Sequence, residues 1–159
     1  MPTQQKKIRS SSPDATQAIA RVLACRLLPG DVVLLEGEIG AGKTHLARGV
    51  IAALLDAPED IPSPTYTLVQ TYDGRSGEIW HADLYRLTDP SEVEELGLFA
   101  AFRYAICLVE WPDRLGPDRP DSALVIGFHA TGADDHRRDL IFSWTAPKWN
   151  ARLSGLEDG

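Results

Sequence analysis

Residues 37–44 read GEIGAGKT and fit the pattern G-x-x-x-x-G-K-T. Glycines in such a loop can adopt positive φ, so the backbone NH groups can wrap closely around a polyphosphate. A helix that begins where the loop ends adds free NH groups and the positive end of its dipole. We therefore expect an anion site here, with Lys43 reaching the outer phosphates and the Thr44 hydroxyl placed for Mg²⁺. The residues expected to contact the nucleotide are Gly37, Glu38, Ile39, Gly40, Ala41, Gly42, Lys43, Thr44 and His45.

The flanks of this loop have the composition that a strand and a helix require. Residues 31–36 (DVVLLE) form a short, mostly apolar run with β-branched side chains, which is typical of a buried parallel strand. After the loop, apolar side chains recur at helical spacing, and we expect the helix to stop near Asp56. The order of strand, glycine loop and helix is the context that a phosphate-binding loop needs.

Patterns along the rest of the chain predict further strands and helices around this unit. Alternating or continuous apolar runs bounded by turn residues indicate strands, and apolar side chains at helical spacing indicate helices. The expected elements are hairpins over 65–82 and 122–144, a buried parallel strand over 104–110, a helix over 14–28 capped by Asp14, and a helix that begins at Ser91 in a capping box with Glu94.

The length of 159 residues suits one domain with a sizeable core. We expect residues 13–146 to form that domain, preceded by a flexible, polar N-terminus at 1–12 and followed by a polar tail at 147–159. The predicted fold class is α/β. It is a single-domain P-loop NTPase fold whose central, mostly parallel sheet is flanked by helices and extended by β-hairpins.

Composition narrows the class of protein. An apolar content of 43% and a charged content of 25% are ordinary for a globular protein. No apolar run reaches membrane-spanning length, and the first ten residues lack a signal-peptide core, so we expect a cytoplasmic protein without a membrane partner. The net charge of −7 argues against a chain that holds nucleic acid by itself. We expect Cys25 and Cys107 to be buried free thiols.

Two carboxylates are candidates for the chemistry beside the loop. Glu110 closes an apolar strand, where it can bind Mg²⁺ directly or through water together with Thr44. Asp83 lies in HADLYR, residues 81–86, and could orient an attacking water, accept its proton, or belong to the outer shell of Mg²⁺. For His81 the pattern favours a half-buried histidine with ordinary hydrogen-bond partners.

Several other residues stay open on pattern alone. Thr65 and Thr67 could place a hydroxyl near the γ-phosphate, although threonine is common in strands. The region near Thr16 and the turn at 129–138 are candidates for contact with adenine. No pattern selects a transition-state cation, and a solvated surface position is the default for each arginine considered. These arginines are Arg86, Arg103, Arg137 and Arg138.

Five motifs occur in order: GEIGAGKT (37–44), SPTYTLV (63–69), HADLYRL (81–87), DPSEVEELG (89–97) and CLVEWP (107–112). Together they resemble the TsaE (YjeE) family of small bacterial P-loop ATPases, which are needed to make threonylcarbamoyladenosine in tRNA. The resemblance covers roughly residues 14–145. The SPTYTLV, HADLYRL and DPSEVEELG motifs are more specific than the loop, since generic nucleoside kinases lack them.

The resemblance implies roles for particular residues. Lys43 and the loop would hold the phosphates of ATP, and Thr44 with Glu110 would bind Mg²⁺. Thr65 would belong to a nucleotide-sensing switch, and Asp83 would be important for hydrolysis. The family acts with the partner proteins TsaB and TsaD. Because TsaD carries out the transfer to adenosine, tRNA would meet this chain only indirectly, through the complex.

Three residues depart from the family's usual pattern. Glu38 stands where aspartate is frequent, His45 where a second threonine is common, and Trp80 where tyrosine is usual. None of them removes a charge or hydroxyl that the chemistry needs.

The function that these inferences favour is Mg²⁺-dependent ATP binding with slow hydrolysis. A chain without a fixed transition-state arginine supplies only part of the charge neutralisation that phosphoryl transfer needs. Two alternatives remain. One is a small-molecule P-loop kinase, which would need an acceptor pocket and an arginine-bearing lid, and the other is a non-catalytic, nucleotide-gated adaptor.

Overall fold

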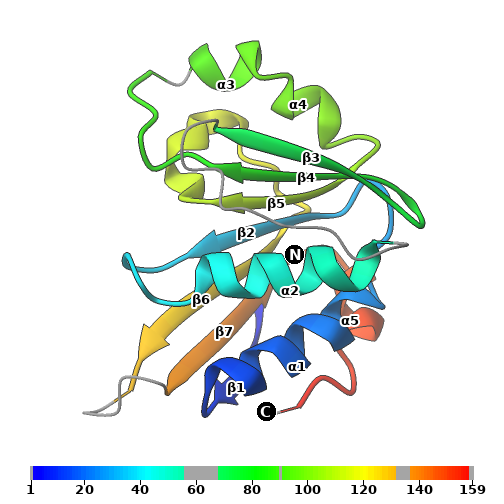
Figure 1. Cartoon of the computed structure of the whole chain (residues 1–159), viewed down its shortest axis with the longest axis vertical. Coiled ribbons are helices and arrows are strands. Elements are labelled where there is room, and N and C mark those ends of the chain that lie inside the picture. Colours follow the sequence, from blue (N-terminus) through cyan, green and yellow to red (C-terminus); the bar gives the residue numbers. More distant parts are fainter. Residues whose placement is uncertain (1, 56–67, 90, 132–136, 158–159) are drawn as a thin grey trace.

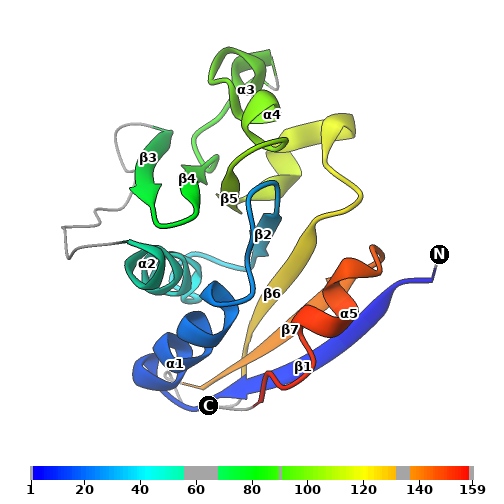
Figure 2. The same cartoon turned by 90° about the vertical axis from the view of Figure 1, so that its right-hand side faces the viewer.

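The computed structural model describes residues 2–55, 68–89, 91–131 and 137–157 (Figures 1 and 2). The described strands form one seven-stranded sheet in the order β1-β7-β6-β2-β5-β4-β3. The strands are β1 (Gln4–Ser10), β2 (Val32–Glu36), β3 (Val69–Gly74), β4 (Gly77–Asp83), β5 (Ile106–Glu110), β6 (Leu124–Ala130) and β7 (Arg138–Trp144). The helices are α1 (Pro13–Ala24), α2 (Lys43–Leu54), α3 (Ser91–Glu95), α4 (Leu98–Ala101), the 3₁₀ helix η1 (Pro112–Asp118) and α5 (Lys148–Arg152).

The middle of the sheet is parallel and its two sides are antiparallel. β2 pairs in parallel with both β5 and β6, and β4 pairs in parallel with β5. The β3–β4 hairpin forms one side of the sheet, while β7 and β1 extend the other. The predicted α/β sheet with flanking helices is therefore confirmed, and so are both hairpins. The expected start of the first hairpin, at residues 65–67, lies outside the described residues.

Apolar side chains cover both faces of the sheet. Successive side chains of a strand point to opposite faces, so an apolar strand contributes to both layers. Val33 and Leu35 of β2 pack with α1 and α2, whereas Val32 and Leu34 pack with α3 and α4. All four side chains are at most 3% exposed. Figure 1 shows α1 and α2 lying across one face, with α3 and α4 beyond the β3–β4 side. A strand buried on both faces is apolar throughout, which is why this segment could be predicted as a central strand.

The N-terminus differs from the flexible segment expected at 1–12. Gln4–Ser10 form β1, an edge strand that pairs with β7 along its whole length. Ile8 is 1% exposed and belongs to the core, and Lys6 Nζ donates to the carbonyl oxygen of Leu153 at 2.8 Å. An edge strand can be mostly polar because its backbone pairs on one side and few of its side chains need burial. Composition alone therefore did not reveal it.

The helix α1 begins and ends earlier than predicted. Its N-cap is Ser12, not Asp14, because Ser12 Oγ accepts a hydrogen bond at 3.0 Å from the backbone NH three residues later. Proline at the next position, Pro13, fits the first turn of a helix, where no intrahelical NH bond is needed. The helix ends at Ala24 and does not reach Leu28.

The helix predicted to begin at Ser91 is short and is followed by a second short helix. Asp89 Oδ1 accepts a hydrogen bond from the NH of Ser91 at 3.0 Å, so an aspartate caps α3. Gly97 adopts the left-handed region with φ of 79° and leads the chain into α4. The predicted capping box between Ser91 and Glu94 is replaced by this aspartate cap.

The C-terminal residues pack on the core, in contrast to the polar tail expected at 147–159. Trp149 of α5 is 0% exposed, and its indole Nε1 donates to the carbonyl oxygen of Ser122 at 2.8 Å. Leu156 is 3% exposed and belongs to the same apolar layer as α1 and α2. The packed domain therefore extends at least to Leu156, ten residues beyond the predicted boundary at 146.

A buried ion-pair network joins α5 to the beginning of β2. Asp31 is 2% exposed and accepts hydrogen bonds from Lys148 Nζ at 2.9 Å and from Arg152 Nη1. Its second oxygen also accepts from the NH of Leu28 at 2.8 Å. A carboxylate removed from water needs such partners, so this network depends on α5 being docked.

The two cysteines lie in different environments. Cys107 is buried as expected, whereas Cys25 is exposed just after α1, and both are free thiols. Burial raises the pKa of the Cys107 thiol to about 12, which keeps it unreactive. Among the described residues, no helix is both long enough and apolar enough to cross a lipid bilayer.

Candidate functional site

The candidate site lies where β4 and β5 end beside the first turn of α2. Asp83 and Glu110 are register partners at the ends of these parallel strands, and His81 shares their face because it lies two residues before Asp83. Earlier alternate residues of both strands belong to the apolar layer against α2. Lys43 and Thr44, the first two residues of α2, therefore meet the carboxylates at the strand ends.

Glycine is required at two positions of the glycine loop, residues 37–42. Gly37 has φ of 143°, and a Cβ there would lie 3.0 Å from both the Cβ and the carbonyl oxygen of Phe128. Gly42, with φ of 104°, is the N-cap of α2 and offers no side chain to the NH groups of the first turn. Since these NH groups have no intrahelical acceptor, this end of the helix can bind an anion.

Arg138 of β7 contacts the glycine loop through two hydrogen bonds to backbone carbonyls. Its Nε donates to the carbonyl oxygen of Ala41 at 3.2 Å, and its Nη2 donates to that of Gly40 at 3.4 Å. These two hydrogen bonds join the loop to the strand beyond β6. A side chain from the second hairpin thus helps to set the path of the loop.

Lys43 is folded back onto the loop and is 4% exposed. Its Nζ donates to the carbonyl oxygens of Gly37 and Glu38, the latter at 3.1 Å. The same ammonium lies 3.9 Å from the centroid of the Trp111 ring, a cation–π contact. These neighbours are all uncharged at their contact points, so the lysine charge remains available for an anion in the loop.

Glu110 connects α2 to β4 through its two carboxylate oxygens. Oε1 accepts a hydrogen bond from the Thr44 hydroxyl at 2.7 Å, and Oε2 lies 2.7 Å from His81 Nε2. Glu110 is 2% exposed and His81 is 0% exposed. The carboxylate is therefore held between a hydroxyl and an imidazole in a site that water barely reaches.

Burial shifts the pKa values of two charged groups in this site. It lowers the pKa of the Lys43 ammonium, and the nearby carboxylates of Glu110 and Asp83 partly oppose that shift. Burial also raises the pKa of Asp83, although a hydrogen bond from the backbone NH of Tyr85 opposes the rise. Perturbed groups that converge in a cavity are typical of functional sites.

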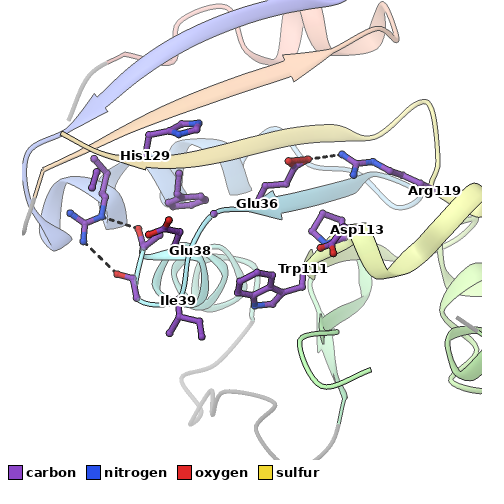
Figure 3. A pocket seen from close by; sticks show the side chains of 14 residues that line it. Glu36, Glu38, Ile39, Trp111, Asp113, Arg119 and His129 are labelled. Atoms are coloured by element: carbon purple, nitrogen blue, oxygen red, sulfur yellow. Dashed lines mark hydrogen bonds and ion pairs between the residues drawn. The ribbon is translucent and has the colours of Figure 1, made fainter. Parts of the chain in front are cut away.

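Three of the cavities in the described part of the chain border the glycine loop. A cavity of about 400 Å³ contains the candidate chemical groups: Lys43, Thr44, Asp83, Tyr85, Glu110 and Trp111. A larger cavity, about 820 Å³, holds an ion pair of 2.7 Å between Arg119 and Glu36 (Figure 3). A third, about 310 Å³, is lined by both Thr16 and His45. The space around the loop thus exceeds what one phosphate group requires.

The donor set beside the loop fits Mg²⁺ better than a metal that needs a cage of protein ligands. The described residues contain no group of three or more His, Cys, Asp or Glu side chains able to hold a metal ion. Thr44 Oγ1 and Glu110 Oε1 provide two hard oxygens 2.7 Å apart. Neighbouring ligands of octahedral Mg²⁺ lie about 2.9 Å apart, and the ion commonly takes only one or two ligands from protein beside phosphates and water.

Comparison with known proteins identifies the family. The family model described as "Threonylcarbamoyl adenosine biosynthesis protein TsaE" matches residues 10–140 of this chain. The chain belongs to the TsaE family. A Rickettsia conorii protein named tRNA threonylcarbamoyladenosine biosynthesis protein TsaE is 42% identical over 148 residues, which cover 93% of this chain and 83% of the relative. A Bacillus subtilis protein of the same name is 37% identical over 140 residues, covering 87% and 85%.

The likeness extends to a solved structure. The crystal structure of Bacillus subtilis YdiB matches this TsaE-family chain with a TM-score of 0.77 at 29% sequence identity. The match covers 98% of this chain and 96% of YdiB. The likeness therefore extends over nearly the full length of both chains.

The fold of this TsaE-family chain brings together most of the residues that the motifs singled out. Four of them line one cavity: Lys43, Thr44, Asp83 and Glu110. Thr65 and Thr67 lie outside the described residues, so their role stays a prediction. His45 Nε2 lies 2.9 Å from the carbonyl oxygen of Pro13, so this departure from the TsaE pattern faces α1.

The arginines that sequence could not distinguish occupy different places. Arg138 contacts the glycine loop, whereas Arg86, Arg103 and Arg137 are exposed. Arg103 precedes β5 and is thus at the end of that strand opposite to Glu110. Of these four arginines, Arg138 is thus the one with hydrogen bonds to the glycine loop.

Two residues of the site were not predicted from the sequence. His81 is fully buried and bonded to Glu110, not half-buried as expected. Trp111 adopts φ of 59°, unusual for a residue other than glycine, and its ring covers Lys43. For His81 a signal was present, because strand periodicity places it on the same face as Asp83.

Proposed function

We propose that this TsaE-family chain has the P-loop NTPase fold, binds ATP with Mg²⁺ at the glycine loop and hydrolyses the ATP slowly. The observation that supports this most strongly is the convergence of a lysine, a hydroxyl and two carboxylates in one cavity at the N-terminus of α2. A phosphate loop, a hydroxyl for the metal and acidic strand ends are the parts that nucleotide hydrolases of this class combine.

Each group has a role that follows from its chemistry. Lys43 would exchange its contacts with loop carbonyls for the outer phosphates, and Thr44 with Glu110 would hold the Mg²⁺ ion. Mg²⁺ bound there would neutralise charge on the phosphate oxygens. Asp83 would orient the attacking water or accept its proton, a role that its raised pKa favours.

We further propose that hydrolysis serves tRNA threonylcarbamoyladenosine biosynthesis together with TsaB and TsaD. The names of the relatives support the pathway. The net charge of −7 supports indirect contact with tRNA through the complex. Arg138 donates to the loop carbonyls of Ala41 and Gly40. We expect a slow basal rate because a chain without a fixed transition-state arginine neutralises the charge of the phosphates incompletely.

Calorimetric titration with ATP, with and without Mg²⁺, tests the binding part of this proposal. The unaltered chain should bind Mg²⁺·ATP, and Lys43→Ala should weaken binding at least about tenfold because a buried charge–phosphate contact is lost. Lys7→Ala removes an exposed lysine of β1 and serves as the matched control. Absence of binding by the unaltered chain at millimolar ATP, or equal binding by both variants, would contradict the proposal.

Turnover measurements test the enzymatic part and separate it from the alternatives. Adding TsaB and TsaD should change the rate of ATP hydrolysis by the unaltered chain. Phosphate transfer to an added alcohol in preference to water would indicate a kinase. An Asp83→Ala chain that binds ATP and still supports tRNA modification would indicate a nucleotide-gated adaptor.

A further inference from the structure

We propose that His81 is a positioning residue for Glu110. It fixes one carboxylate oxygen so that the other faces Thr44 and the Mg²⁺ that accompanies the nucleotide. This inference rests on the proposed function of the loop and adds a residue to the site. His81 does not touch the phosphates or the metal in this scheme, and it acts through Glu110 alone.

The geometry that supports the proposal is a chain of three side chains from three elements. Thr44 Oγ1 of α2 lies 2.7 Å from Glu110 Oε1, and Glu110 Oε2 lies 2.7 Å from His81 Nε2 of β4. The two oxygens of one carboxylate thus have separate partners. Exposure of 0% for His81 and 2% for Glu110 keeps water from replacing the imidazole.

A carboxylate without the imidazole would have more freedom than this site allows. The last torsion of a glutamate side chain has a broad distribution, so the orientation of its oxygens is set by hydrogen bonds. A carboxylate binds Mg²⁺ more tightly when a second group holds the oxygen that does not contact the metal. The imidazole supplies that contact from a neighbouring strand, whose register with β5 is fixed by backbone pairing.

The second ring nitrogen of His81 argues against a role in packing alone. Because a carboxylate oxygen accepts, Nε2 carries the hydrogen, and Nδ1 has no hydrogen-bond partner among the described residues. Leaving a buried polar atom without a partner is unfavourable, and an apolar side chain would avoid it. The bond to Glu110 is the feature of His81 that leucine could not provide.

The test compares His81→Leu with His81→Gln in titrations of Mg²⁺ at fixed ATP. His81→Leu keeps similar volume and removes the donor, so the Mg²⁺ concentration for half-maximal binding should rise about 10–100-fold. ATP affinity measured in excess EDTA should stay unchanged in this variant, since the loop and Lys43 are intact. His81→Gln, which can place an amide NH near the Nε2 position, should recover most of the Mg²⁺ affinity.

Two controls separate positioning from general damage to the sheet. Cys107 is buried in β5, and its thiol donates to the carbonyl oxygen of Ala105, not to Glu110. Cys107→Ala should therefore lower the melting temperature and leave the Mg²⁺ dependence of ATP binding unchanged. In a Glu110→Ala background, His81→Leu should cause no further loss of Mg²⁺ affinity, because the side chain through which His81 acts on the metal is absent.

The outcomes also distinguish this inference from the function on which it rests. If the unaltered chain bound no Mg²⁺·ATP, the proposed function and this inference would both fail. If the unaltered chain bound it and His81→Leu showed unchanged Mg²⁺ dependence, only the inference would fail. Equal losses of Mg²⁺ affinity in His81→Leu and Cys107→Ala, or an equal further loss in the Glu110→Ala background, would also overturn it.

Discussion

Asp83 occupies a half-buried position at the end of β4, one strand away from Glu110. Burial raises its pKa, while the backbone NH of Tyr85 opposes the shift and the charge of Glu110 adds to it. A carboxylate of this kind holds a proton more tightly than an exposed aspartate does. In the proposed ATP hydrolysis, this property would suit a group that orients or deprotonates water.

Replacing Asp83 with asparagine should separate binding from hydrolysis. Asp83→Asn keeps the shape of the side chain and removes the proton acceptor, so turnover should fall about 100-fold or more. ATP affinity should stay close to that of the unaltered chain because Lys43 and the loop are intact. Asp113→Asn, at an exposed carboxylate of the neighbouring cavity, is the control. An Asp83→Asn chain that turned over ATP at the original rate would exclude the assigned role.

The raised pKa of Asp83 also predicts how activity and stability depend on pH. A free aspartate has a pKa of about 3.9. Because burial raises the pKa of Asp83 in the folded chain, Asp83 becomes protonated at a higher pH than a free aspartate does. Turnover should therefore begin to decline at that higher pH.

The sign for stability follows from the same shift. The folded chain takes up this proton more readily than the unfolded chain, so the charged carboxylate destabilises the fold at neutral pH and the penalty disappears on acidification. Asp83→Asn should therefore raise the melting temperature at neutral pH, and the gain should shrink as the pH falls. Melting curves of both proteins across this pH range provide the measurement. A gain that grew on acidification would be inconsistent with the assigned shift.

Residues with a role in a motif could be predicted from sequence, whereas residues defined by contacts could not. Lys43 and Thr44 follow from the spacing of the glycine loop, and Glu110 from its place at the end of an apolar strand. The contact of Arg138 with the loop depends on how the second hairpin pairs with β2, which no local pattern specifies. The partner of His81 likewise depends on the register between β4 and β5.

At the scale of elements, α1 and α2 approach closely at one glycine. A Cβ on Gly49 would lie 2.8 Å from the Cβ of Ala20, a distance that requires the helices to move. Alanine is the better helix former by about 1 kcal/mol. Crowding in a packed interface costs about 1–3 kcal/mol, so it outweighs that gain. Glycine is therefore favoured at this position despite its poor helix propensity.

Gly49→Ala should accordingly lower the free energy of unfolding by up to about 2 kcal/mol, measured by chemical denaturation. Ala20→Gly removes the opposing methyl group, so the double variant should lose less stability than the sum of the two single variants. Ala52→Gly, at an exposed position of α2, gives the propensity contribution alone. Strict additivity of the two substitutions would show that the helices do not meet at this point.

The accuracy of element prediction followed the strength of the apolar pattern. β2 and β5 are buried on both faces, so their apolar runs identified them with nearly the observed bounds. β1 has only one buried apolar side chain, that of Ile8, and it pairs with β7, which lies far away in the sequence. Neither feature gives a local apolar pattern. Caps were the least predictable feature, because Ser12 and Asp14 are both good N-cap residues and only the path of the backbone distinguishes them.

At the scale of the whole molecule, α5 joins the C-terminus to the core that supports the site. Trp149→Ala would empty a fully buried volume, so the free energy of unfolding should fall by about 3–5 kcal/mol. Glu157→Ala changes an exposed residue nearby, and its effect should stay within about 0.5 kcal/mol. A loss below about 1 kcal/mol in the Trp149→Ala denaturation curve would indicate that α5 is not docked in solution.

The docked C-terminus was not predictable from local composition. Residues 147–159 are mostly polar, but Trp149, Leu153 and Leu156 are spaced so that one face of the segment is apolar. Asp31, which precedes β2, binds α5 through Lys148 and Arg152. Because Asp31 is far from Lys148 and Arg152 in the sequence, local patterns do not show that they pair.

The glycine loop and the two strand-end carboxylates are proposed to form one site for a magnesium–triphosphate. A crystal structure with a non-hydrolysable ATP analogue and Mn²⁺ in place of Mg²⁺ tests it most directly, because Mn²⁺ can be located by its anomalous scattering. We expect the phosphates within the loop at Lys43 and an anomalous peak bound by Thr44 and Glu110, with Asp83 facing the γ-phosphate. An analogue bound elsewhere, or a metal peak away from Thr44 and Glu110, would contradict it.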